Sequence, residues 1–144
     1  MPLGTVLELS FDDLEADNKD YQYKIEHMTH DWKSSQLSSS QYINGFDQNT
    51  IINTTNSFNT LQNYTHYSVN IPNINTDITK SGNYLLSVLN EADDIVFTRR
   101  FVLYESATTV GVTVARSRNT KTLNSQQTVE FSINHPQIKI NSPN

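Results

Sequence analysis

Apolar and polar residues alternate with a period of two along much of the chain, which is typical of strands that bury one face. The first such segment covers residues 7–11, and the second runs from Tyr21 to Ile25 with an aromatic apolar face. A third covers residues 64–71 and ends at Pro72, because proline cannot donate to a sheet ladder. The predicted buried side of this third strand consists of Thr65, Tyr67, Val69 and Ile71.

The strongest local pairing signal lies between residues 84 and 104. Residues 84–89 and 95–104 are rich in apolar side chains, and residues 90–94 (Asn-Glu-Ala-Asp-Asp) are typical of a turn. The pattern therefore predicts a β-hairpin. Three further strands are predicted at 110–114, 129–133 and 138–140.

Polar segments separate the predicted strands. Residues 33–41 are rich in Ser and Gln and predict a loop, and residues 74–80 predict a polar connection. Residues 44–63 are crowded with Asn and Thr, and three apolar side chains are the expected core contacts there: Ile51, Ile52 and Phe58.

Many short strands without an amphipathic helix predict an all-β fold, an antiparallel β-sandwich. Gly82 lies two residues before Tyr84, a spacing similar to the tyrosine corner of immunoglobulin-like folds, in which a phenol bonds to upstream backbone. We expect an immunoglobulin-like sandwich over residues 1–106. Residues 107–144 are too few for a second sandwich and predict the N-terminal strands of a truncated second β-domain. The expected structural core includes Tyr23, Tyr84, Phe101 and, as the central indole, Trp32.

Composition narrows the functional classes. The 144 residues are only 35% hydrophobic, below the usual ~45–50%, although seven Tyr, six Phe and one Trp can fill a core. The absence of cysteine excludes disulfides, thiolate zinc sites and a cysteine nucleophile. Neither a phosphate-binding glycine loop nor a nucleophile elbow occurs, so the sequence predicts no cofactor and no enzyme.

Charge and hydropathy restrict the partners. Residues 1–31 carry eight acidic residues and two lysines, whereas residues 95–144 carry six basic and two acidic residues. This acidic start argues against a nucleic-acid partner for the whole chain. No apolar run reaches the ~18 residues of a membrane span, and the first residues lack the pattern of a signal peptide. We expect either a cytoplasmic chain or one whose signal peptide is removed, and its end interrupts a strand pattern.

Two groups of residues have metal-ligand chemistry. His27, His30 and Asp31 follow a strand, where odd spacing places side chains on opposite faces. A second group could bind calcium through carboxylates, but it lacks the loop glycine and Lys19 interrupts it. That group comprises Asp12, Asp13, Glu15, Asp17 and Asp20. Neither pattern predicts a metal site, and no serine, histidine and aspartate combination is singled out as a triad.

Several motifs together resemble the first domain of type IX secretion system plug proteins. They include Tyr21-x-Tyr23-x-Ile25-x-His27, Asp31-Trp32-x-x-Ser35 and Tyr42-x-x-Gly45-Phe46. Further along are Asn56-Ser57-Phe58-Asn59-Thr60, Tyr64-Thr65-His66-Tyr67 and Ile71-Pro72-Asn73. The motif Ser81-Gly82-Asn83-Tyr84-Leu85-Leu86 and the closing Val96-Phe97-Thr98-Arg99-Arg100-Phe101 complete the pattern, in order, over nearly all of residues 1–135.

The resemblance implies a periplasmic, non-catalytic protein that occludes the periplasmic end of the outer-membrane translocon barrel. It implies no catalytic, metal or cofactor residue. We expect the contacts to be polar and to use the acidic segment and an arginine pair: Asp12, Asp13, Glu15, Asp17, Arg99 and Arg100. Residues 108–140 are expected to form a homo-oligomer or to swap strands between copies, since their edges lack partners.

Two other functions remain open from the sequence. The first is a carbohydrate-binding β-sandwich module that stacks exposed aromatic rings on sugars, for which the candidates are Tyr42, Phe46, Tyr64 and Tyr67. The second is a periplasmic sensor-type β-sandwich of a two-component regulator, which the shorter pattern Tyr21-x-Tyr23-x-Ile25…Asp31-Trp32 is similar to.

Overall fold

The computed structural model describes residues 1–136, which form two compact units, Met1–Glu105 and a second that begins at Ser106. Within the described residues, the secondary structure consists of eleven strands and one short 3-10 helix. No helix among residues 1–136 has the length and hydropathy needed to cross a membrane. The strand predicted at residues 138–140 lies outside the described residues.

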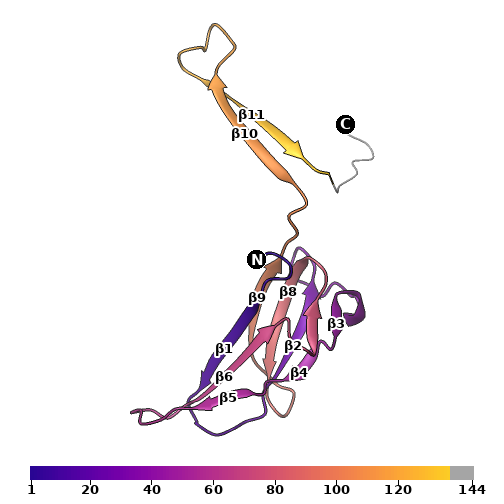
Figure 1. Cartoon of the computed structure of the whole chain (residues 1–144), viewed down its shortest axis with the longest axis vertical. Coiled ribbons are helices and arrows are strands. Elements are labelled where there is room, and N and C mark those ends of the chain that lie inside the picture. Colours follow the sequence, from indigo (N-terminus) through magenta and orange to yellow (C-terminus); the bar gives the residue numbers. More distant parts are fainter. Residues whose placement is uncertain (137–144) are drawn as a thin grey trace. The chain divides into compact units, whose positions relative to one another are not determined.

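Two antiparallel sheets make up most of the first unit (Figure 1). The three-stranded sheet has the order β1-β6-β5 and consists of β1 (Leu7–Asp13), β6 (Thr65–Ile71) and β5 (Asn53–Asn56). The four-stranded sheet has the order β4-β2-β8-β9 and consists of β4 (Gln48–Thr50), β2 (Gln22–Met28), β8 (Gly82–Leu89) and β9 (Ile95–Leu103). The predicted all-β, antiparallel fold is therefore confirmed, and both sheets contribute to one core of the sandwich type.

The predicted hairpin between residues 84 and 104 is also confirmed. Strands β8 and β9 pair along their length, with one register shift at Val88/Leu89. The Asn90 side chain stabilises the turn by accepting hydrogen bonds from the N–H groups of Ala92 (3.0 Å) and Asp94 (2.9 Å). Asparagine at the start of such a turn replaces a missing backbone acceptor, which explains the clear sequence signal.

A small sheet occupies part of the segment that the sequence predicts as a polar connection. Strand β7 (Thr76–Ile78) pairs with β3 (Ile43–Gly45), which follows the 3-10 helix η1 (Ser39–Gln41). The prediction for residues 74–80 was therefore wrong. The Thr76 side chain is buried because its hydroxyl donates to the carbonyl of Phe46 (2.8 Å) and bonds the Tyr23 phenol (2.8 Å). A three-residue strand with a satisfied buried threonine has no distinct sequence period.

One aromatic group joins the two sheets. The Phe11 ring in β1 stacks on Tyr67 in β6 at 5.2 Å and meets the edge of Phe97 in β9, also at 5.2 Å. Tyr21, which precedes β2, contacts both Phe11 and Tyr67 edge-on. Since such ring pairs add to the burial energy, these four residues compensate for the low hydrophobic fraction of the chain.

A second aromatic group surrounds Tyr84 in β8. The Tyr84 ring is fully buried, stacks on the half-buried Phe101 at 5.4 Å and meets the ring of His27 at 5.1 Å. Its phenol donates to the carbonyl of Lys80 at 2.7 Å, the upstream backbone bond that the Gly82-x-Tyr84 spacing predicts. A Cβ at Gly82, whose φ is +155°, would lie 2.4 Å from the His27 ring, so only glycine permits this packing.

Some expected core residues lie elsewhere. Trp32 is half-buried and outside the core cluster, because a turn after β2 places it on the outer side of the four-stranded sheet. Tyr23 fills the interior instead, at 1% exposure. Of the three apolar residues expected to contact the core between residues 44 and 63, only Ile51 is buried, whereas Ile52 and Phe58 are 82% and 93% exposed.

The second unit contains a β-hairpin of β10 (Thr109–Arg116) and β11 (Gln127–Asn134), as the alternation there predicts. The antiparallel register aligns the apolar side chains in three cross-strand pairs: Val110 with Ile133, Val112 with Phe131 and Val114 with Val129. All six residues lie on one face and all are exposed within the described residues. Two strands alone bury little surface, so this hairpin has an uncovered apolar face.

Candidate protein interface

The acidic segment between β1 and β2 is folded around a lysine. The Lys19 ammonium lies 3.1 Å from an Asp13 carboxylate oxygen and 3.3 Å from one of Asp17, and it also pairs with Glu15. Lys19 is the residue that interrupts the acidic pattern in the sequence, and it supplies the positive charge that the three carboxylates share.

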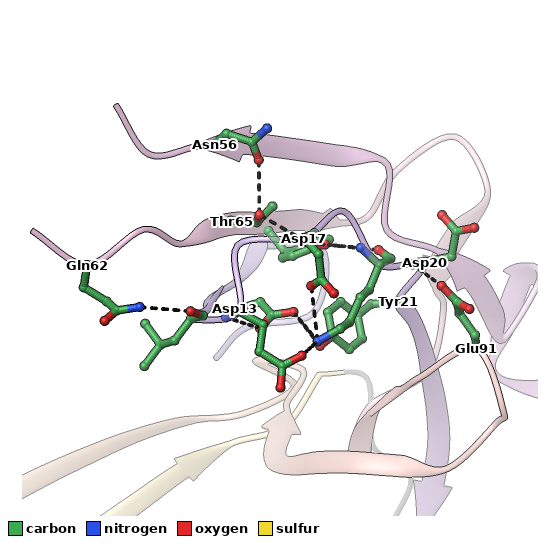
Figure 2. Close-up of polar contacts among 12 residues, drawn as sticks. Asp13, Asp17, Asp20, Tyr21, Asn56, Gln62, Thr65 and Glu91 are labelled. Carbon is green, nitrogen blue, oxygen red and sulfur yellow. Dashed lines mark hydrogen bonds and ion pairs between the residues drawn. The ribbon is translucent and has the colours of Figure 1, made fainter. Parts of the chain in front are cut away.

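Core residues hold this segment in place (Figure 2). The Tyr67 phenol accepts a hydrogen bond from the Lys19 N–H (2.9 Å), and the Thr65 hydroxyl donates to the carbonyl of Asp17 (3.2 Å). Farther out, Gln62 donates to the Leu14 carbonyl and the Asp20 N–H donates to Glu91. The loop is therefore an ordered part of the first unit, with backbone groups that β6 satisfies.

Asp13 is the most enclosed carboxylate of the cluster, with a side chain that is only 9% exposed. Burial raises its pKa. Hydrogen bonds from the Glu15 N–H, Lys19 and the Tyr21 phenol together lower it by more than burial raises it, so the net pKa is below its usual value. Burial and the bond to Asp13 raise the pKa of Tyr21 to about 12. The Lys19 pKa is also raised, chiefly by Glu15. At neutral pH Asp13 and Lys19 are therefore charged and the Tyr21 phenol is protonated, and the lysine occupies the position between the carboxylates that calcium would need.

The other metal-ligand group does not converge. The ring of His27 packs against Tyr42 and Tyr84, its Nδ1 is buried without a hydrogen-bond partner, and His30 is exposed. Burial and the nearby charge of Lys80 lower the pKa of His27, despite a bond to the backbone at Ser81. Among residues 1–136, Asp13, Glu15 and Asp17 are the one set of three side chains close enough to share an ion.

The candidate sugar-stacking aromatics are mostly inside the first unit. Tyr42 and Tyr67 are buried at 4% and 0% exposure, so they cannot stack on a sugar ring. Tyr64 is half-buried, and Phe46 is exposed at the end of β3. These four rings therefore form no exposed platform for a sugar.

A groove separates β1 and β9, the two edge strands on the same side of the first unit. It has a volume of about 430 Å³. Its floor is apolar, with Leu9 and Phe11 from β1 and Phe97 from β9. Asp12, Asp13 and Arg99 also line it, whereas Glu15, Asp17 and Arg100, the other three predicted contact residues, do not. Asp12 is bonded to the half-exposed His66, at 2.6 Å.

The two predicted arginines lie on opposite faces of β9. The Arg99 guanidinium lies over the Phe97 ring at 5.2 Å and donates to the carbonyl of Thr98 (3.1 Å). Arg100 points to the outer side, where its guanidinium lies 4.8 Å from the centroid of the Trp32 ring. Neither arginine forms an ion pair with a carboxylate in the part of the chain that the structure describes.

Trp32 was missed as a surface residue by the sequence reasoning. A tight turn presents it, in which the Thr29 and Lys33 backbones bond each other and the Trp32 N–H donates to the Thr29 carbonyl (3.0 Å). Its φ of +62° is the left-handed region, an outlier for a bulky residue. The sequence signal was present in the turn-forming Thr-His-Asp before it, which argues against a continued strand.

Comparisons with known proteins agree on the first unit. A family model described as "Type 9 secretion system plug protein 1st domain" matches residues 1–105. A crystal structure of a hypothetical protein from Parabacteroides merdae ATCC 43184 superposes with a TM-score of 0.76 and is 34% identical. The match covers 97% of this chain and 36% of that protein, so the chain spans about a third of its relative's length. No curated protein matches the chain at a significant level.

The family match and the first compact unit cover the same residues. The matched range ends at Glu105, where the first compact unit ends. The family is one of secretion-system plug domains and not an enzyme family. The chain belongs to the type 9 secretion system plug protein family, of which it contains the first domain.

Proposed function

We propose that this chain is a non-catalytic interaction domain of the periplasm that helps to occlude the periplasmic end of the type IX outer-membrane translocon. The family supports a secretion-related role for residues 1–105. Two sheets that share one aromatic core suit a steric function, because the packed core makes the unit rigid and its loops and edges remain free for contacts.

The observation that carries this proposal is a group of side chains at and beside β9 that form no ion pair among the described residues. The half-buried Trp32 and the exposed Arg100 form a pair on the outer side of the sheet, and Arg99 borders the groove without a carboxylate partner among the described residues. Tryptophan and arginine are the residue types most enriched among energetically important interface residues. The acidic cluster is a weaker candidate, since Lys19 already neutralises part of its charge.

The second unit fits a role within a longer protein. The relative from Parabacteroides merdae is nearly three times as long as the matched segment, since the match covers 36% of it. We propose that β10 and β11 are N-terminal strands of a second β-domain, whose remaining strands cover their apolar face. The steric plug would then consist of several β-domains, with the first unit providing one contact surface.

The test is capture from solubilised outer membranes of the source organism, with this chain as bait and mass spectrometry as the readout. We expect recovery of the translocon barrel and its loss with the double variant Arg99→Glu/Arg100→Glu. Lys121→Glu, an exposed charge reversal in the second unit, is the matched control and should retain the barrel. Absence of the barrel with both this chain and its full-length parent protein as bait would contradict the proposed function.

A further inference from the structure

The edge of β9 has open backbone groups as well as uncommitted side chains. β9 is the last strand of its sheet and pairs with β8 on one side only. Near its end, the chain's own N-terminus already pairs with the free side: the Met1 ammonium donates to the Val102 carbonyl (2.9 Å), and the Tyr104 N–H donates to the Met1 carbonyl (3.1 Å). The even-numbered residues of β9 therefore direct their backbone N–H and C=O groups toward the free edge of the strand, away from β8.

The same period applies to Thr98 and Arg100, beyond the reach of the N-terminal segment. The Arg99 side chain confirms the direction at Thr98, because it donates to that carbonyl from the free side of the strand. Charged side chains on an edge are a common protection against unwanted strand pairing. At Thr98 this protection comes from the Arg99 side chain alone, which a partner can displace.

We propose that this edge binds an extended segment of a protein partner by adding a strand to the four-stranded sheet, a mode that rests on the proposed interaction function. Alternate side chains of the added strand would face the groove floor of Leu9, Phe11 and Phe97, so those positions are apolar. The opposite positions would face the outer side, where Arg100 and Trp32 lie. The segment is therefore an alternating apolar and polar strand with an acidic residue beside Arg100.

Charge favours this partner over a second copy, and it favours the edge of β9 over that of β1. A second copy pairing its own β9 in antiparallel orientation would bring Arg99 and Arg100 of both copies close together, which is unfavourable. The other wall of the groove, β1, has Glu8 and Asp12 as exposed charges, so an acidic strand is repelled there. The outer face near Arg100 has its acidic neighbour Glu26 within an ion pair with Lys24 (3.8 Å), which leaves the guanidinium available.

The test uses the whole chain and a defined probe, a nine-residue peptide of alternating valine and threonine with glutamate at the central polar position. Amide hydrogen exchange and chemical shifts are followed by nuclear magnetic resonance. We expect at least tenfold slower exchange of the Thr98 and Arg100 amides at millimolar peptide, and no change in the edge strand β5. The peptide with lysine in place of glutamate should bind at least fivefold more weakly, and Arg100→Glu should invert that preference.

Two variants at one position separate backbone pairing from side-chain effects. Thr98→Pro removes an outward N–H without removing a bond to β8, whereas Thr98→Val keeps that N–H and is the matched control. We expect Thr98→Pro to abolish peptide binding and Thr98→Val to retain it. If the proline variant does not fold, slower exchange of the Thr98 and Arg100 amides of the unsubstituted chain in the presence of peptide tests backbone pairing directly. Unchanged Thr98 and Arg100 amides, or protection of β1 amides instead, would overturn the inference.

Failure of the inference and failure of the proposed function give different results. If the chain captures the translocon barrel but does not bind the peptide, the proposed function is retained and strand addition at β9 is refuted. Peptide binding at β9 without capture of the barrel by either this chain or its full-length parent would retain strand addition and refute the plug function.

Discussion

The guanidinium of Arg100 lies over the indole of Trp32, 4.8 Å from the ring centroid, on the outer side of the four-stranded sheet. Trp32 lies on a turn after β2 and Arg100 on the edge strand β9, so the pair spans the sheet. The pair combines a flat ring and a cation that has no carboxylate partner within residues 1–136. Such a pair is suited to binding an acidic or aromatic group, because the indole holds the arginine in one orientation.

Trp32→Ala should weaken partner binding much more than it destabilises the fold. Trp32 is half-buried and lies outside the core, so we expect a small change in the denaturant midpoint. Loss of an interface tryptophan should reduce affinity for the translocon component at least tenfold, about 1.4 kcal/mol. Titration with the purified partner measures the affinity, and urea unfolding measures stability. Strong destabilisation with unchanged affinity would show that the indole is structural.

The same tryptophan provides a direct probe of the arginine contact. Trp32 is the one tryptophan in the chain, so its fluorescence reports this site alone. We expect Arg100→Gln to change the emission intensity of the folded protein, because the stacked cation is removed. Arg99→Gln, on the opposite face of β9, is the matched control and should leave the emission unchanged. Equal effects of both substitutions would contradict the observed geometry.

Tyr84→Phe should destabilise the first unit by about 1–2 kcal/mol, since it leaves the Lys80 carbonyl without its 2.7 Å hydrogen bond. The ring remains, so stacking with Phe101 is retained. Denaturant unfolding gives the change in the midpoint, and an unaltered slope would show that the unfolded state is unaffected. Tyr104→Phe removes a half-exposed phenol and should cost less than about 0.5 kcal/mol.

Lys19→Gln should lower stability because it leaves Asp13, Glu15 and Asp17 close together without their shared positive charge. Asp13 suffers most, as its carboxylate is nearly enclosed. The thermal midpoint should fall, and added salt should restore part of the loss by screening the repulsion. The parent chain should show no change in its midpoint with calcium. A calcium-dependent increase in the parent would mean that the carboxylates are a metal site after all.

Stability should decrease as the pH falls below about 6.5, because of His27. Burial and Lys80 lower its pKa in the folded state, so the unfolded chain binds a proton first as the pH decreases. The stability contribution is complete above the unfolded pKa and is lost as the pH approaches the lower folded value. Asp13 adds no slope in this window, since its pKa is lowered from 3.8.

Urea unfolding between pH 5 and 8 measures this dependence. His27→Gln should flatten the curve in that window, at some cost in packing against Tyr84. The parent and the variant should converge at the acidic end of the range. A curve for the unsubstituted chain that is already flat would contradict the lowered pKa of His27 in the folded state.

Local pairing was the part of the fold that the sequence predicted best. Residues 84–104 combine two apolar runs with a turn that Asn90 stabilises, so local chemistry and the final fold agree. The buried face of residues 65–71 follows from the same period, and Tyr84 follows from the position of Gly82. These features depend on neighbours that are close in sequence, where alternation and turn chemistry give a direct signal.

The errors have two different causes. Trp32 was expected in the core because it is large and apolar, but a turn with a positive φ directs it outward. Thr76 was expected in a polar connection, but three partners from distant segments bond its hydroxyl, and the nearby Asn73 side chain accepts from its backbone N–H. The position of Trp32 follows from a local turn, between Thr29 and Lys33, whose sequence signal was present. The burial of Thr76 depends mainly on contacts between residues far apart in the sequence, which a single-chain pattern does not encode.

In the candidate site, too, single residues were predictable from the sequence and their arrangement in space was not. The sequence singled out Asp13 and Arg99, but its reasoning treated Lys19 as an interruption of the acidic segment. In the structure, Lys19 is the residue around which the segment is organised, and the phenol of Tyr67 fixes its backbone. The groove between β1 and β9 was not predictable, because it requires two edge strands from different sheets to lie side by side.

The hairpin of β10 and β11 should cause self-association of this chain in isolation. Its six paired valine, phenylalanine and isoleucine side chains form one continuous exposed stripe within the described residues, which is unfavourable in water. In a solution of this chain alone, other copies are the available apolar surface.

The double variant Val112→Thr/Phe131→Ser keeps the register and removes the centre of the stripe. Sedimentation should show concentration-dependent dimers for the parent and monomers for the variant, while Thr113→Ser, on the opposite face, should behave like the parent. A parent chain that stays monomeric at high concentration would contradict self-association, and this result combined with protease resistance of the hairpin would mean that its stripe is covered within one chain.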